Sequence, residues 1–74
     1  MRTLKIDMGD LETENHVPLI VRAAAAAGIR GVHSAQRSHG IDGQWTLLGR
    51  PARAGDAQPV REVVWVDVVQ SAAA

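Results

Sequence analysis

The sequence predicts a small α+β domain, in which an antiparallel sheet of about four strands carries one helix packed on one face, in the order β-α-β-β-β. Three observations support this class. The chain has only 74 residues, an Ala-rich segment with helical spacing follows a short alternating segment, and an Asp-Gly pair separates two strand-like segments. We expect residues 1–70 to form a single domain and residues 71–74 to form a frayed C-terminal tail.

The first two elements follow from residue spacing. Apolar and polar residues alternate at the start of the chain, which is typical of a strand with one buried face. The apolar positions are Leu4, Ile6 and Met8. Pro18 is tolerated only in the first turn of a helix, so a helix begins near residues 14–16. Its apolar stripe is rich in alanine, and Gly28 stands where a left-handed C-terminal cap is expected.

A hairpin is expected in the middle of the chain. Residues 29–41 have the pattern of a long, largely polar strand, and Asp42-Gly43 is a strong signal for a two-residue type I′ turn. With that turn, residues whose numbers sum to 85 face each other, and Trp45 lies over Gly40. The opposite face of the hairpin then carries four basic or titratable side chains, which are His33, Arg37, His39 and Arg50.

The last strand is the clearest in the sequence. Residues 51–59 form a loop without periodicity, and residues 60–70 form a strand with two largely apolar faces. Such a strand lies centrally in its sheet or in a subunit interface, because one helix covers only one face. A domain of this size hides an extra apolar stripe poorly, so we predict an interface at Val63, Trp65 and Val69 and a homo-oligomeric protein.

Composition and motifs favour a binding function over catalysis. The chain has no cysteine, and its three histidines lack the spacing of a metal motif. The serines beside His33 and His39 lack the flanking features of a nucleophile site, so no catalytic residue, metal or cofactor is expected, and an enzyme is the least favoured class. No apolar run is long enough to cross a bilayer or to form a signal peptide, which predicts a cytoplasmic protein without a membrane partner.

Charge is unevenly distributed, although the formal net charge is zero. Residues 1–15 hold two basic and four acidic side chains, whereas residues 29–54 hold four arginines and one aspartate. We predict that the basic segment and an exposed tryptophan bind a protein or a protein–nucleic-acid complex. The predicted partner-binding residues are Arg30, His33, Arg37, His39, Arg50, Arg53 and Trp65. Direct nucleic-acid binding by the hairpin arginines is the alternative, since arginine pairs with phosphate and an aromatic ring stacks on bases.

In size and element order the chain resembles some small phage- or plasmid-encoded inhibitors, including certain anti-CRISPR proteins. Those proteins pair a short antiparallel sheet with one helix. The resemblance concerns layout alone and carries no diagnostic motif. It implies a small non-enzymatic interaction protein of phage or plasmid origin, which would act as an anti-defence inhibitor by binding its target.

Overall fold

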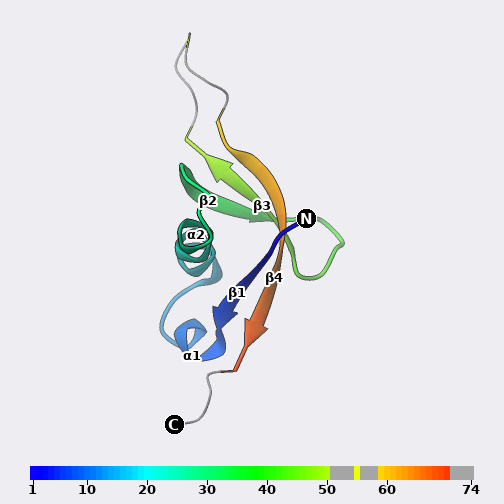
Figure 1. Cartoon of the computed structure of the whole chain (residues 1–74). Coiled ribbons are helices and arrows are strands. Elements are labelled where there is room, and N and C mark those ends of the chain that lie inside the picture. The colour runs from blue at the N-terminus through cyan, green and yellow to red at the C-terminus, as the bar shows by residue number, and fades with distance from the viewer. Residues whose placement is uncertain (51–54, 56–58, 71–74) are drawn as a thin grey trace.

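The computed structural model describes residues 1–50, 55 and 59–70. A four-stranded sheet carries one long helix on one face (Figure 1), which confirms the predicted α+β class and the predicted number of strands. A short additional helix follows the first strand. The elements in chain order are β1 (Thr3–Asp7), α1 (Met8–Leu11), α2 (His16–Ala26), β2 (Val32–Arg37), β3 (Gln44–Gly49) and β4 (Arg61–Val69).

The sheet is mixed, with the strand order β1-β4-β3-β2. β2 pairs with β3 and β3 pairs with β4 in antiparallel fashion, but β1 and β4 are parallel, so the expectation of a wholly antiparallel sheet is wrong for this pair. The reason is the connectivity. The helical crossover leaves β2 running in the same direction as β1, and two reversals then bring β4 back to that direction.

β4 is an inner strand of the sheet, which is one of the two positions that its apolar faces predict. Its first half pairs with β3 and its second half pairs with β1, and Trp65 lies at the junction opposite both Gln44 and Thr3. Figure 1 shows this stagger, with β3 beside one half of the long β4 ribbon and β1 beside the other, and β2 follows β3 in the sheet. β4 therefore joins β1 to the β2–β3 hairpin within the sheet.

The core lies between the sheet and α2, which begins at His16 and has Pro18 in its first turn, as predicted. The buried residues are mostly aliphatic, and no buried polar or charged side chain occurs in the described part of the chain. They are Leu4, Ile6, Leu19, Ile20, Ala24, Ile29, Ala35, Trp45, Leu47, Val64 and Val66. Met8, expected as the last inward residue of the first strand, instead begins α1, because the Asp7 carboxylate accepts a hydrogen bond from the Gly9 N–H at 2.7 Å and caps that helix.

The C-terminus of α2 has the predicted glycine cap. Gly28 has a φ of 84°, and its N–H donates to the Ala25 carbonyl at 3.0 Å. The Ile29 N–H donates to the Ala24 carbonyl at 3.0 Å, and the buried Ile29 side chain joins the core. This pair of bonds is the Schellman motif, which satisfies the last helical carbonyls and turns the chain toward β2.

Replacing Gly28 with alanine is expected to lower the free energy of unfolding by about 1 to 2 kcal/mol, because a residue with a Cβ atom is strained at this backbone angle. No atom lies within 4 Å of the position a Cβ would take, so the loss measures conformational strain and not a clash. Gly28→Asn is the matched control, since asparagine tolerates the left-handed region better. Urea denaturation checks the ranking, and a Gly28→Ala variant as stable as the parent would contradict it.

The hairpin register differs from the predicted one. Ala35 pairs with Leu47 and Arg37 with Trp45, so facing residue numbers sum to 82 rather than 85. β2 ends at Arg37, and residues 38–43 connect the two strands in place of the two-residue connection expected at Asp42-Gly43. Asp42 and Gly43 still form a turn within this loop, where the Gln44 N–H donates to the Ile41 carbonyl at 3.4 Å. A shift by an odd number of residues exchanges the two faces of one strand relative to the other. Arg37 consequently lies on the same face as Trp45, and not on the opposite one.

No helix in residues 1–50 or in the other described positions is long and apolar enough to cross a membrane. The longer of the two helices, α2, has 11 residues, and a membrane-spanning helix needs about 20.

Candidate interaction surfaces

The face of the sheet that α2 covers holds an aromatic and cationic stack. Trp45 is 7% exposed, and the His16 ring stacks on it with 5.7 Å between ring centroids and an interplanar angle of 19°. The Arg37 guanidinium carbon lies 5.1 Å from the Trp45 ring centroid, at cation–π distance. Arg37 therefore contacts the edge of the core, and the predicted single face shared by four basic side chains does not form.

The other members of that predicted group separate as well. His39 is exposed in the loop of residues 38–43, at one end of the β2–β3 hairpin. His33 and Arg50 lie near the other end, where Val32 pairs with Gly49. The separation follows from the register, because β2 ends at Arg37 and not at the predicted residue 41, which leaves His39 beyond the last paired residue.

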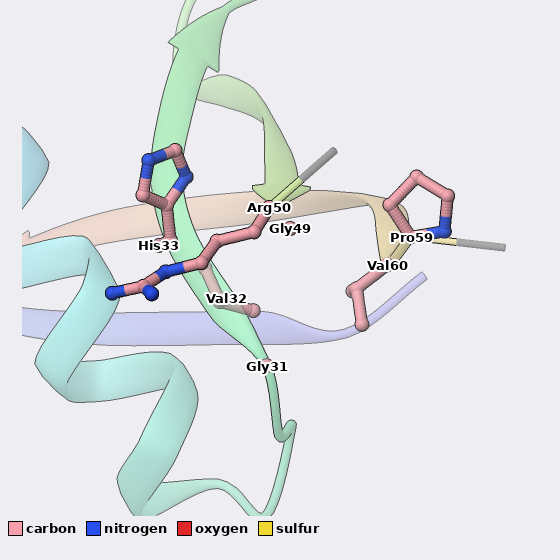
Figure 2. Close-up of a pocket in the computed structure, with 7 residues that line it drawn as sticks. All are labelled: Gly31, Val32, His33, Gly49, Arg50, Pro59 and Val60. Carbon is pink, nitrogen blue, oxygen red and sulfur yellow. The ribbon is translucent and has the colours of Figure 1, made fainter. Parts of the chain in front are cut away.

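His33 and Arg50 line one pocket of about 560 Å³ at the end of the hairpin (Figure 2). Arg30 is exposed in the segment just before β2, three residues from His33. Arg53, the remaining predicted arginine, lies outside the described residues. The other residues that line the pocket are Gly31, Val32, Gly49, Pro59 and Val60.

The face of the sheet turned away from α2, called here the open face, carries the predicted interface residues. Val63, Trp65 and Val69 are alternate residues of β4, and each has 38% of its surface exposed. The structure thus places the three together, and their burial by a partner stays a prediction. It also separates Trp65 from Arg37, which points to the opposite face, so these two predicted binding residues do not act on one surface.

Polar and charged side chains surround this apolar stripe. Thr3 and Gln44 flank Trp65 on the neighbouring strands, and Lys5 lies directly opposite Asp67. Arg61 at the start of β4 lies opposite Leu48, and sequence reasoning missed both as members of this surface. The true register alone reveals Leu48, whereas the alternation of β4 already places Arg61 in line with Val63. The strand positions on the open face are Thr3, Lys5, Asp7, Ser34, Gln36, Gln44, Thr46, Leu48, Arg61, Val63, Trp65, Asp67 and Val69.

Histidines and carboxylates are the side chains of this chain that could bind a metal ion. In the part of the chain that the structure describes, no three or more of these side chains gather closely enough to hold a metal ion. The two ion pairs found there, Arg2 with Glu62 at 3.1 Å and Arg22 with Glu14, are between partly exposed side chains. Exposed pairs of this kind contribute little to stability.

No protein-family model, curated protein or solved structure matches the chain. A function therefore has to be inferred from the two surfaces described above, the open face of the sheet and the cationic pocket at the end of the hairpin.

Proposed function

We propose that the chain is a small interaction protein that associates with a second copy of itself through the open face. The observation that carries this proposal is the one-sided cover of the sheet. α2 packs on one face only, while β4 exposes two valines and a tryptophan on the other. Val63 and Trp65 are neighbours on this face, and Asp67 lies between Trp65 and Val69. Exposed apolar side chains of this kind favour association, because their burial removes apolar surface from water.

The charges on the open face favour a second copy as the occupant. Arg61 lies at the start of β4 and Asp67 near its end, with Trp65 between them. If two copies pack face to face about a two-fold axis near Trp65, with their β4 strands antiparallel, Arg61 of each copy approaches Asp67 of the other. The formal net charge of the chain is zero, so two copies do not repel each other at long range.

Trp65 is the expected anchor of this contact. It lies at the centre of the open face, where β1, β3 and β4 meet, and tryptophan contributes more to interfaces than most residues because of its large apolar area. Removing a central anchor commonly costs about 2 kcal/mol or more of binding free energy, which is roughly a 30-fold weaker dimer.

Replacing Trp65 with serine is therefore expected to dissociate the dimer while leaving the fold intact, because the side chain contacts solvent in the monomer. Light scattering over a range of concentrations measures association, and circular dichroism reports on the fold. Ile41→Ser is the matched control, since Ile41 is 45% exposed but lies in the β2–β3 loop, away from the open face. A wild-type chain that is monomeric throughout, or a Trp65→Ser variant that associates as the wild type does, would overturn the proposal.

A further inference from the structure

The hairpin end that holds His33 and Arg50 is a meeting point of three strands. Val32 near the start of β2 pairs with Gly49 at the end of β3, and the Gly49 N–H donates to the Val60 carbonyl, just before β4, at 2.8 Å. A Cβ atom added at Gly49 would lie 2.8 Å from the Val60 backbone nitrogen, so this close approach requires glycine. The result is a pocket lined by two glycines and by two side chains, His33 and Arg50, that carry hydrogen-bond donor groups.

The two arginines at this end, Arg30 and Arg50, have no acidic counterpart among the described residues that line the pocket. Arg30, His33 and Arg50 come from the segments around it, and the described carboxylates lie elsewhere. Asp42 is in the loop at the opposite end of the hairpin, and Glu62 is engaged by Arg2 at 3.1 Å. The remaining described carboxylates are Asp7, Asp10, Glu12, Glu14 and Asp67, in and after β1 or late in β4. The local field therefore favours an anion.

The two side chains suit an oxyanion in particular. Figure 2 shows the His33 side chain projecting from β2 and the Arg50 side chain from the residue after β3, both on the side of the hairpin end away from Pro59 and Val60, with the Arg50 guanidinium extending below the His33 ring. An arginine presents a planar fork of N–H donors that matches two oxygens of a phosphate, and a neutral histidine still presents one ring N–H. With Gly31 and Gly49 in the lining, no bulky side chain at those positions separates a ligand from the backbone.

We propose that this pocket binds a phosphate group, held by hydrogen bonds from Arg50 and His33 and by the field of Arg30. The site is separate from the open face, since none of its lining residues belongs to that surface. It therefore goes beyond self-association, and a dimer formed through the open face leaves the pocket free. The phosphate comes either from a small metabolite or from a nucleic-acid backbone, and both offer the same oxygens to the pocket.

Titration with inorganic phosphate at constant ionic strength, followed by amide chemical shifts, tests the site. We expect saturable shifts at Gly31, His33, Gly49 and Arg50, with affinity roughly tenfold weaker in Arg50→Gln because a charge-assisted hydrogen bond is lost. His33→Gln, which removes the second donor, is expected to weaken binding by a smaller factor. Arg22→Gln is the matched control, since Arg22 is exposed on α2 and paired with Glu14, and it should bind phosphate as the parent does.

A second arm uses a short single-stranded oligothymidylate in the same titration. Tighter binding that also depends on Arg50 supports the pocket with a nucleic-acid backbone as the source, and binding no tighter than that of inorganic phosphate supports it with a small ligand. The absence of saturable shifts with phosphate, or phosphate or oligothymidylate binding that Arg50→Gln and His33→Gln leave unchanged, would overturn the proposal. Trp65→Ser should retain phosphate binding, so failure of self-association and failure of this site are distinguishable.

Discussion

Replacing Leu47 with alanine is expected to lower the free energy of unfolding by about 2 to 5 kcal/mol. Leu47 has no exposed surface, and it lies on β3 with its side chain in the core between the sheet and α2. At roughly 0.05 to 0.15 kcal/mol per residue, a 74-residue domain has a total stability of only about 4 to 11 kcal/mol. One core truncation therefore removes a large fraction of the stability, because the core is small and the cavity closes only in part.

Thermal denaturation at a concentration where the chain is monomeric measures this loss. The melting temperature of Leu47→Ala should fall by at least about 8 °C. Leu48→Ala is the matched control, because Leu48 is the next residue but lies on the open face, half-buried and opposite Arg61. Equal losses at the two positions would contradict the assignment of the faces of β3.

Replacing Trp45 with alanine is expected to lower the free energy of unfolding by about 3 to 5 kcal/mol. The indole is buried and is contacted by the His16 ring at the start of α2 and by the Arg37 guanidinium at the end of β2. The substitution removes apolar burial and also the ring on which these two side chains rest. The start of α2 and the end of β2 should become less protected together.

Trp45→Phe separates the two contributions, since it keeps an aromatic ring for His16 and Arg37 while reducing the buried volume. We expect a smaller loss of stability for this variant, measured by urea denaturation alongside Trp45→Ala. Hydrogen exchange of the amides near His16 and Arg37 should rise in Trp45→Ala more than in Trp45→Phe. Equal exchange in both variants would show that the stack does not hold these elements.

The features predicted correctly from sequence depend on signals within one segment. Pro18 and Gly28 bound α2 because each acts on its own turn of backbone, and residues 60–70 show both apolar faces of β4 without reference to a partner strand. The prediction that Val63, Trp65 and Val69 share one face of β4 is also local, since every second residue of a strand points to the same face. The parallel pairing of β1 with β4 has no local signal, because it depends on the whole connectivity.

The hairpin shows how a tertiary contact overrides a local signal. Asp42-Gly43 favours a two-residue turn, but the Gly43 carbonyl accepts a hydrogen bond from the Val66 N–H of β4 at 2.8 Å, which holds Gly43 beside another strand. The observed register also pairs the buried Ala35 with Leu47 and sets Arg37 on the Trp45 ring. The bond from β4 and this packing outweigh the turn preference, so the register shifts by three residues and the predicted basic face divides.

The basic residues of the predicted binding site lie in separate places in the structure, and the sequence alone could not show this. A cluster predicted from residues on two strands depends on the pairing register of those strands. The observed register is shifted by three residues, which places Arg37 on the α2 side and leaves His39 in the loop. His33 and Arg50 stay together because they lie close to the strand ends, where the Val32–Gly49 pair fixes them. The pocket that they line also includes Val60, which lies just before β4. No local sequence pattern indicates the contact between Val60 and the hairpin.

Intermolecular nuclear Overhauser effects in a mixture of isotope-labelled and unlabelled chains test the central claim, association through the open face, most directly. We predict contacts between the Trp65 indole of one copy and Val63, Val69 or Leu48 methyl groups of the other. Intermolecular contacts confined to α2 or to the hairpin end, or none at all at high concentration, would contradict the claim.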